Sequence, residues 1–197
     1  MRSTKQVKYV ETYSQPIVII GFMGCGKSTL GRRLARVLKL GFIDLDQQIV
    51  ATAGCTVAEI FEKDGEKGFR RQETRALKAA LKPGHIVALG GGTVSSAQNR
   101  KILAKHRAHV VWIDPSWRTL WQRLGLMNAR VRPLLWNRAQ NQPQSERKIK
   151  ALWSRRRAIY RRAADVRMQV GNGFTEKQAL TRLLGLMTLV TSHDSCK

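Results

Sequence analysis

The residues most suggestive of chemistry form a glycine-rich segment near the start of the chain. Residues 21–28 read GFMGCGKS, which satisfies the pattern G-x-x-x-x-G-K-[ST]. In this pattern the glycines let backbone N–H groups curl around phosphate oxygens, and the following helix adds its positive N-terminus. Lys27 would reach the β- and γ-phosphates, and Ser28 would bind Mg²⁺. The segment predicts an ATP or GTP site, with a chance glycine-rich turn as the alternative.

Two carboxylates follow this segment. Asp44 and Asp46 come directly after the short apolar run 41–43. Placed at i and i+2 after a strand, both can face a nucleotide pocket, one holding a magnesium-bound water and the other a substrate hydroxyl. Positioning and charge neutralisation contribute more to phosphoryl transfer than proton abstraction does. We therefore expect the carboxylate that meets the hydroxyl to orient it first and to serve as a base second, with a solvated acidic turn as the alternative.

Arginines that could bind an anionic substrate occur in two helical stretches. Arg70 lies three residues before Glu73, so the two share one helix face. A guanidinium offers a bidentate fork to a carboxylate, which makes Arg70 the first choice for holding a carboxylated substrate. The second stretch holds three consecutive arginines, Arg155, Arg156 and Arg157, and the residues alone leave the choice among them open. The alternative for any single arginine in so basic a stretch is a solvated helix face.

A triple glycine, Gly90-Gly91-Gly92, follows the apolar run 86–89. Without side chains, the backbone can approach a ligand closely. In an open parallel sheet, ligands bind at the carboxyl ends of the strands. We therefore expect a substrate ring at this point, with a flexible turn as the alternative.

The elements that must position these groups alternate between short apolar strands and helices. Thr56 with Glu59 forms a capping-box pattern at one helix start. The alternation predicts an α/β fold of three layers around a central parallel sheet of about five strands. Residues 127–145 hold two prolines and little periodicity, which predicts a mobile flap, and residues 1–14 and 191–197 read as loose ends. Strands are expected at 17–20, 41–43, 86–89, 108–113 and 166–170, and helices at 27–40, 47–53, 56–63, 66–81, 96–106, 117–126, 146–164 and 175–189.

Charge is the outlying property of the composition. The chain has 36 Lys and Arg residues against 13 Asp and Glu residues, a formal net charge of +23. So large a positive charge favours an anionic partner, which could be nucleic acid, an acidic membrane surface or a small phosphorylated substrate. The alternative is that the basic composition only reflects the proteome of the host. The apolar runs are shorter than the ~18–20 residues that cross a bilayer. The first residues lack an apolar signal region, and an odd number of cysteines favours reduced thiols, so we expect a cytoplasmic protein.

Taken in order, the motifs resemble the shikimate kinase family over roughly residues 16–170. They are GFMGCGKST, DLD at 44–46, GEKGFRRQE at 65–73, LGGGTV at 89–94, RPLL at 132–135 and RRRAIY ending at residue 160. The resemblance implies a P-loop kinase domain at 15–190, with a substrate-binding region near 44–75 and a lid near 124–145. It also implies transfer of the ATP γ-phosphoryl group to the 3-hydroxyl of shikimate, with ATP as co-substrate, Mg²⁺ as cofactor and a monomeric enzyme.

The resemblance further implies roles for individual residues. Two departures from the family pattern stand out: the segment between Arg132 and Arg156 is longer than usual, and the loop at 171–173 lacks an arginine or proline near adenine. The implied catalytic residues are Lys27, Asp46 and Arg132, and the implied metal-binding residues are Ser28 and Asp44. ATP would contact Gly24, Cys25, Gly26, Lys27, Ser28, Thr29, Arg123 and the lid residue Arg132, and shikimate would contact Asp46, Arg70, Glu73, Gly90, Gly91, Gly92 and Arg156.

Two alternatives stay open at this point. Another small-molecule kinase, such as a gluconate or nucleoside monophosphate kinase, is disfavoured by the combination of the D-x-D, Arg70 and the triple glycine. A nucleic-acid-binding P-loop protein is suggested by the basic stretch 100–170. It is disfavoured because the tryptophans are spread over several elements and do not interleave with the basic residues as a stacking platform. We therefore expect no functional nucleic acid partner.

Overall fold

The computed structural model describes residues 13–125, 136–137, 142–171 and 173–194. Five strands form one sheet in the order β2-β3-β1-β4-β7, and every neighbouring pair is parallel. The predicted parallel sheet of about five strands is confirmed. The strands are β1 (Ile17–Ile20), β2 (Gly41–Asp44), β3 (His85–Ala88), β4 (His109–Pro115) and β7 (Val166–Val170).

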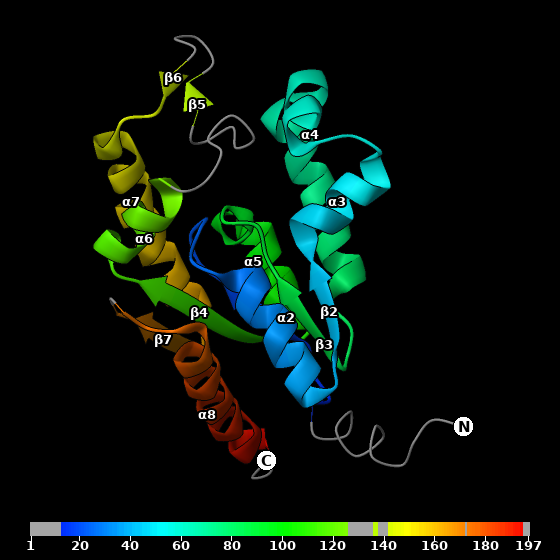
Figure 1. Ribbon diagram of the computed structural model, residues 1–197. Coiled ribbons are helices and arrows are strands. Elements are labelled where there is room, and N and C mark those ends of the chain that lie inside the picture. Colours follow the sequence, from blue (N-terminus) through cyan, green and yellow to red (C-terminus); the bar gives the residue numbers. More distant parts are fainter. Residues whose placement is uncertain (1–12, 126–135, 138–141, 172, 195–197) are drawn as a thin grey trace.

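Helices cover both faces of this sheet, which gives the three layers expected (Figure 1). Helices α2 (Lys27–Leu38) and α8 (Glu176–Asp194) pack on one face, and α5 (Ala97–Lys105) and α7 (Glu146–Ala163) cover the other. No helix in the described part of the chain is long and apolar enough to cross a membrane. The remaining elements are α3 (Leu45–Ala53), α4 (Val57–Ala80), the short 3-10 helix η1 (Thr93–Ser95), α6 (Trp117–Gly125) and an antiparallel pair, β5 (Trp136–Asn137) and β6 (Gln142–Pro143).

Strand β1 is the centre of the core. Its four residues are almost fully buried, as expected for an apolar run with neighbours on both sides. Helix α2 adds Leu30, Leu34 and Leu38, whose spacing of four residues places them on one buried face. The centre of the sheet therefore offers a rigid support for the glycine-rich loop that follows β1.

Helix α4 consists of two helical halves that meet at a kink at Gly65, which agrees with the two helices predicted at 56–63 and 66–81. Gly65 has φ 66° and ψ −176°, a left-handed conformation that breaks the regular hydrogen bonding of the helix. The predicted capping box is confirmed: the Thr56 hydroxyl accepts from the Glu59 N–H at 3.2 Å, and the Glu59 carboxylate accepts from the Thr56 N–H at 2.6 Å. The half after the kink carries Arg70 and Glu73.

The ends of the described chain are more ordered than predicted. Tyr13 is buried, and its carbonyl accepts a hydrogen bond from the Gly84 N–H at 3.3 Å. Helix α8 extends to Asp194, so residues 191–194, expected in a loose tail, are helical. No glycine or proline occurs between 186 and 194 to stop this helix. Arg132 and most of the expected lid lie outside the described residues.

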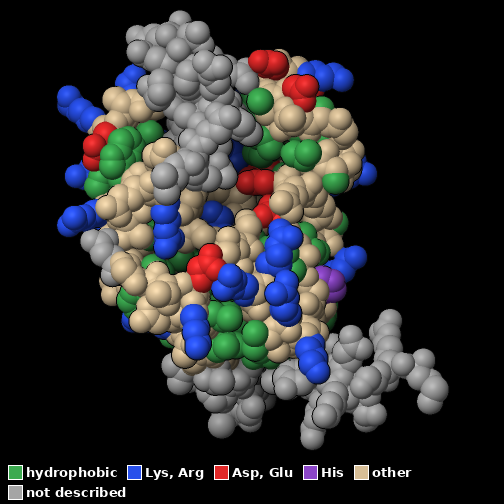
Figure 2. All heavy atoms as spheres, viewed as in Figure 1, with side chains coloured by type: hydrophobic (Ala, Val, Ile, Leu, Met, Phe, Trp, Pro, Cys, Tyr) green, Lys and Arg blue, Asp and Glu red, His purple; other side chains and the backbone are tan. Residues whose placement is uncertain are grey.

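On the face seen in Figure 2, the described basic side chains do not gather in one patch. Figure 2 shows Lys and Arg spread over the whole visible face, with gaps of polar and apolar surface between them. The hollow near the centre of this view has both acidic and basic side chains around it.

Candidate active site

The glycine-rich loop joins β1 to α2 at the carboxyl edge of the sheet. The Lys27 ammonium donates hydrogen bonds to the carbonyl oxygens of Gly21 and Phe22, each at 3.0 Å. The Ser28 hydroxyl donates to the Asp44 carboxylate at 2.5 Å. A cation, a hydroxyl and a carboxylate thus lie together next to a helix N-terminus, as a phosphate site with a bound metal ion requires.

Glycine is required at two positions of this loop. Gly21 has φ +147°, and a Cβ there would lie 2.6 Å from the backbone oxygen of Ile113 in β4. Gly26 has φ +98° and forms the N-cap of α2. Both conformations are ones that other residues rarely adopt. The loop therefore keeps its backbone N–H groups free of side chains that would block a phosphate.

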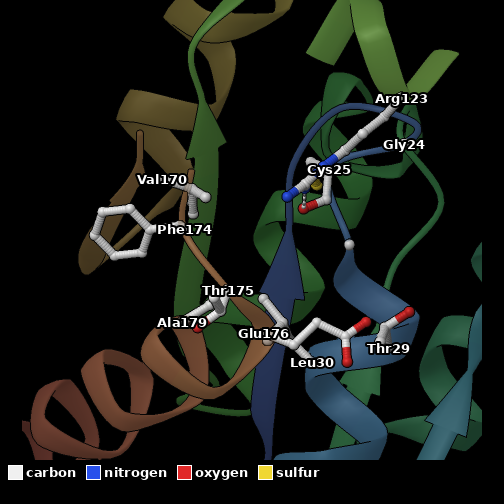
Figure 3. A pocket seen from close by; sticks show the side chains of 11 residues that line it. Gly24, Cys25, Thr29, Leu30, Arg123, Val170, Phe174, Thr175, Glu176 and Ala179 are labelled. Atoms are coloured by element: carbon white, nitrogen blue, oxygen red, sulfur yellow. Dashed lines mark hydrogen bonds between the residues drawn. The ribbon is translucent and has the colours of Figure 1, made fainter. Parts of the chain in front are cut away.

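A cavity of about 240 Å³ opens beside the loop (Figure 3). Arg123, from α6, lies along the loop and donates a hydrogen bond from Nη1 to the Cys25 carbonyl at 3.2 Å. Phe174 and the first turn of α8 line the cavity from the other side. A guanidinium and an aromatic ring are both suitable neighbours for a planar nucleotide base. The ring of Phe174 stands near the position where the family pattern led us to look for an arginine or proline.

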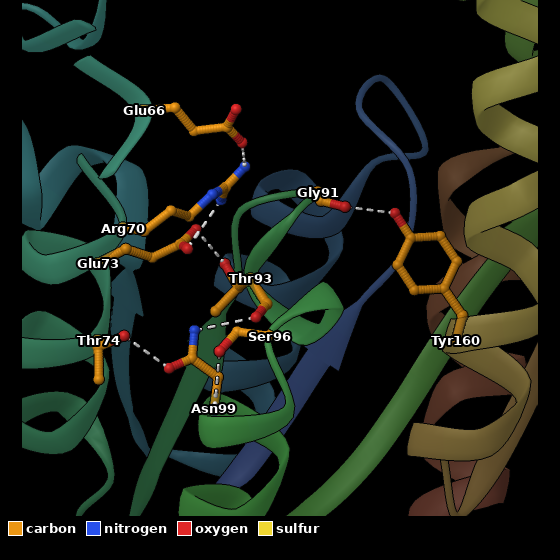
Figure 4. A network of polar contacts seen from close by, with 9 residues as sticks. All are labelled: Glu66, Arg70, Glu73, Thr74, Gly91, Thr93, Ser96, Asn99 and Tyr160. Carbon is orange, nitrogen blue, oxygen red and sulfur yellow. Dashed lines mark hydrogen bonds and ion pairs between the residues drawn. The ribbon is translucent and has the colours of Figure 1, made fainter. Parts of the chain in front are cut away.

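A second group of polar residues lies across the carboxyl edge of the sheet, on α4, η1 and α5 (Figure 4). Arg70 donates from Nη1 to Glu73 at 2.8 Å, and Glu73 is 1% exposed. The other Glu73 oxygen accepts from the Thr93 hydroxyl at 2.7 Å. Asn99 extends the chain, because it donates to the Thr93 carbonyl at 2.9 Å and accepts from the Thr74 hydroxyl at 2.8 Å. A buried network of hydrogen bonds through Glu73, Thr93 and Asn99 therefore fixes the position of Arg70.

Arg156, from α7, faces Arg70 across the triple glycine. A Cβ on Gly92 would lie 2.8 Å from Arg70 Nη2 and 3.3 Å from Arg156 Nη2. Arg156 is 7% exposed, and its Nη1 has no hydrogen-bond partner among the residues that the structure describes. Its guanidinium lies 5.6 Å from the centre of the Phe22 ring. Two guanidinium groups therefore converge on one small space that only glycine can border.

The environments of the two arginines differ. Burial, with a contribution from the positive charge of Arg70, lowers the pKa of Arg156. Burial also lowers the pKa of Arg70, but the carboxylates of Glu73 and Glu66 outweigh it and raise that pKa overall. Arg70 thus has acidic partners, whereas Arg156 is a buried cation with an open donor. This pair is suited to a carboxylate, which would supply the missing acceptor.

Asp46 borders the same space from α3. A Cβ on Gly90 would lie 2.6 Å from an Asp46 oxygen and 3.3 Å from a Glu73 oxygen. The triple glycine thus has carboxylates at its first residue and guanidinium groups at its last. A small molecule lying on it could present a hydroxyl to Asp46 and an anionic group to the arginines.

A family model described as shikimate kinase matches residues 23–186. The chain belongs to the shikimate kinase family. Shikimate kinase of Symbiobacterium thermophilum is 39% identical over 153 residues, which cover 77% of this chain and 84% of that protein. Shikimate kinase of Mycobacterium avium is 43% identical over 152 residues, covering 77% and 81%. The solved shikimate kinase from Acinetobacter baumannii in complex with shikimate has a TM-score of 0.75 and 32% identity, and covers 91% of this chain and 94% of its own.

Membership of the shikimate kinase family confirms the predicted class of enzyme, an ATP-dependent kinase of the shikimate pathway. It also confirms the predicted P-loop kinase fold. The gluconate-kinase and nucleic-acid-binding alternatives are set aside, because identities of 39% and 43% over most of the chain point to one family.

Ser28 and Asp44 fit the Mg²⁺ ion that a family of ATP-dependent kinases implies. Mg²⁺ is usually bound through one or two protein oxygens, with phosphates and water completing an octahedron. The Ser28 hydroxyl and the Asp44 carboxylate lie 2.5 Å apart beside the phosphate loop, so together they supply such oxygens. The described residues contain no group of three or more His, Cys, Asp or Glu that could hold a metal without such help.

Most of the predicted residues come together, with two qualifications. Arg132 lies outside the described residues, and Thr29 is exposed and lines the cavity beside the glycine-rich loop. Of the three consecutive arginines on α7, Arg155 is exposed and Arg157 pairs with Asp114, so Arg156 is the one that faces the triple glycine.

Sequence reasoning missed three residues that shape the site. Tyr160 is buried and donates its hydroxyl to the Gly91 carbonyl at 2.5 Å, which ties α7 to the triple glycine. Its spacing of four residues from Arg156 was a usable signal, because such a pair shares one helix face. Thr93 and Asn99, which support Glu73, carry no sequence signal of their own, because ordinary helix starts contain the same residue types.

Proposed function

We propose that the chain transfers the γ-phosphoryl group of ATP to the 3-hydroxyl of shikimate, with the shikimate carboxylate bound between Arg70 and Arg156. The observation that carries this proposal is the buried Arg156 guanidinium, whose Nη1 lacks a hydrogen-bond partner in the described part of the chain. An unpaired buried cation is costly, and a carboxylate would satisfy it with charge-assisted hydrogen bonds. The complex of the Acinetobacter baumannii relative with shikimate supports the choice of substrate.

The phosphate loop and Asp46 would carry out the transfer. Lys27, which now donates to the carbonyls of Gly21 and Phe22, would turn to the β- and γ-phosphates and neutralise the charge that develops there. Asp46 would accept a hydrogen bond from the 3-hydroxyl and aim its oxygen at the γ-phosphorus. It would take up the proton as the new O–P bond forms and the bond from the γ-phosphorus to the β–γ bridging oxygen breaks, so that ADP leaves. Arg123 and Phe174 would border the adenine base.

Ser28 and Asp44 would hold the Mg²⁺ ion, with Ser28 contributing its hydroxyl oxygen and Asp44 either a direct ligand or an acceptor for a bound water. When bound, the ion neutralises charge on the β- and γ-phosphate oxygens. The hydrogen bond between these two side chains keeps both oxygens next to the phosphate loop. Asp44 also accepts from the Gln47 N–H at 3.3 Å as the N-cap of α3, which fixes its orientation.

We further propose the organisation that the family pattern implies. Residues 44–75 would form the substrate-binding region, and residues 124–145 a lid whose Arg132 reaches the transferring phosphoryl group. Lid closure would exclude water and so prevent hydrolysis of ATP without substrate. The enzyme would act as a cytoplasmic monomer, and its spread of basic side chains would steer small anions without binding nucleic acid tightly.

A coupled assay of ADP release with and without shikimate tests the proposal. We expect release to depend on shikimate, and Arg70→Ala to weaken shikimate binding by ~2–5 kcal/mol, the range for removing one partner of a buried charge pair. Arg71→Ala is the matched control, because Arg71 is exposed on the same helix. A shikimate analogue with the carboxylate reduced to an alcohol should bind poorly to both the wild type and Arg70→Ala. Equal shikimate affinity in Arg70→Ala and the wild type would exclude the proposed carboxylate site.

A further inference from the structure

A buried carboxylate outside the reaction site links α7 to the sheet. Asp114, near the carboxyl end of β4, has a side chain that is 3% exposed. Arg157 of α7 donates to both of its oxygens, from Nε at 3.2 Å and from Nη2 at 2.8 Å. Arg167 of β7 donates to one oxygen, from Nε at 2.9 Å and from Nη2 at 2.7 Å. One acidic side chain thus accepts four N–H groups from two arginines.

Aromatic rings hold these arginines in place. The Arg157 guanidinium lies 4.7 Å from the centre of the Trp153 ring and 5.7 Å from that of Trp112. The Arg167 guanidinium lies 5.0 Å from the centre of the Trp112 ring. Stacking of this kind fixes the plane of a guanidinium, and a fixed plane makes the bidentate pair with Asp114 directional. The ion pair between Arg157 and Asp114 therefore determines both how far α7 lies from β4 and how α7 is rotated about its own axis.

The position of this link on α7 is what connects it to the reaction site. Arg156 and Arg157 are adjacent, and neighbours on a helix point about 100° apart. When Arg157 is held by Asp114, Arg156 must point toward Gly92 and Arg70. Tyr160, one turn later, holds the same helix to the Gly91 carbonyl at 2.5 Å. Two ties of α7, at Arg157 and at Tyr160, lie within the turn that follows Arg156 and therefore determine where its guanidinium lies.

The ion pair of Arg157 with Asp114 also opposes the repulsion between Arg156 and Arg70, two cations that the proposed carboxylate site places close together. Arg156 and Arg70 approach the same point near Gly92 with like charges, and Arg156 has no acidic partner among the described residues. Before a carboxylate binds, this repulsion tends to move α7 away from α4. The ion pair of Arg157 with the buried Asp114 carboxylate opposes this movement, because it holds α7 against β4 at the residue next to Arg156.

From this arrangement we propose that Asp114 is a positioning residue for the carboxylate of the substrate: through Arg157 it fixes α7, and with it Arg156, at the triple glycine. The inference rests on the proposed role of Arg156 in binding that carboxylate. Asp114 touches neither substrate in this account. Loss of the Asp114 carboxylate would weaken shikimate binding because it would displace Arg156. The phosphate loop would stay in place.

Steady-state kinetics of the full chain, with thermal unfolding of each variant, test the proposal. Arg157→Met and Asp114→Asn should each raise the KM for shikimate about tenfold, since misplacing a binding group by about 1 Å can cost one to two orders of magnitude. The KM for ATP should stay within about twofold. Arg157→Lys, which keeps the charge but loses the fork, should lie between the wild type and Arg157→Met.

Arg167→Met is the matched control. Arg167 pairs with the same carboxylate at a similar distance, but it belongs to β7 and not to α7. It should lower the melting temperature and leave the KM for shikimate within about twofold of the wild type. The double variant D114N/R157M should raise that KM no more than either single change, because both remove one link.

Two outcomes would overturn the proposal. One is an equal rise of the shikimate KM in Arg157→Met and Arg167→Met, which would assign Asp114 a purely structural role. The other is an unchanged shikimate KM in a folded Arg157→Met, and this variant decides the matter if Asp114→Asn does not fold. Arg156→Met, measured in parallel, separates the two proposals: if it leaves the shikimate KM unchanged, the carboxylate site itself is wrong, and if it alone raises the KM, the positioning role is wrong.

Discussion

Replacing Arg156 by methionine should stabilise the free protein and impair its binding of shikimate. Arg156 is 7% exposed, and in the described part of the chain its Nη1 has no partner. A buried unsatisfied polar group costs about 1–3 kcal/mol of folding free energy. Methionine keeps a similar length and removes this cost, but it loses the cation–π contact with Phe22, about 0.5–2 kcal/mol.

The difference between these two terms is a net stabilisation of about 1 kcal/mol, or a rise of about 2–4 °C in melting temperature for a domain of this size. The carboxylate of shikimate would at the same time lose one of its two cations. Truncating one partner of a buried charge pair costs about 2–5 kcal/mol, which corresponds to an affinity loss from about 30-fold to several thousand-fold. The two effects have opposite signs, which a general loss of structure could not produce.

Thermal unfolding with and without shikimate, together with ADP release at saturating ATP, measures both effects in one preparation. Shikimate should raise the melting temperature of the wild type and leave that of Arg156→Met unchanged. Arg155→Met is the control, because Arg155 is the preceding residue, carries the same charge and is exposed. It should change neither the unfolding temperature nor the shikimate KM appreciably. A less stable Arg156→Met that still binds shikimate with wild-type affinity would refute the reasoning.

Three further predictions follow from the phosphate loop, from the D-x-D and from the charge. Lys27→Ala should keep the fold and lower kcat far more than tenfold, and a retained kcat above about a tenth of wild type, a loss under ~1.4 kcal/mol, would exclude its phosphate role. Asp46→Asn should lower kcat strongly with little change in the KM for ATP, because it removes the charge that orients the attacking hydroxyl while keeping the size of the side chain; an equal rise of the KM for ATP would contradict this. Binding to duplex DNA, measured by fluorescence anisotropy, should be weak and lost at moderate salt because it depends on counterion release, and tight binding at several tenths molar salt would revive a role with nucleic acid.

The parts of the molecule that local patterns encode could be predicted from the sequence. Strand β1 is a short apolar run, and the loop after it has glycines where a positive φ or a close backbone approach demands them. Most of the predicted strands and helices match the structure within a few residues, and many of them, such as β1 between Pro16 and Gly21, are bounded by Gly, Pro or a capping residue. Gly65 marks the break predicted between the two halves of α4, and α8 runs on to Asp194 because no glycine or proline intervenes after Gly185.

Local patterns could not decide among the three neighbouring arginines of α7, and only the resemblance to the shikimate kinase family pointed to Arg156. Arg155, Arg156 and Arg157 are chemically identical, and the way α7 lies over β4 decides which of them is exposed, which faces the triple glycine and which pairs with Asp114. That crossing depends on contacts between residues more than forty positions apart, which no local pattern contains. Asp114 lies directly after the strand predicted at 108–113, and its role becomes visible only with its partners Arg157 and Arg167 in place.

The direction of the strands has a practical consequence for handling the enzyme. The groups assigned to catalysis and binding gather at the carboxyl ends of the strands, whereas Tyr13 lies next to the turn before β3 and α8 ends at the opposite edge of the sheet (Figure 1). A tether to a sensor chip or a fused fluorescent reporter, joined at either of these places, would point away from the bound substrates. Enzyme immobilised near Tyr13 or near the end of α8 should therefore keep the shikimate affinity of the free enzyme, which makes inhibitor screening on a surface feasible.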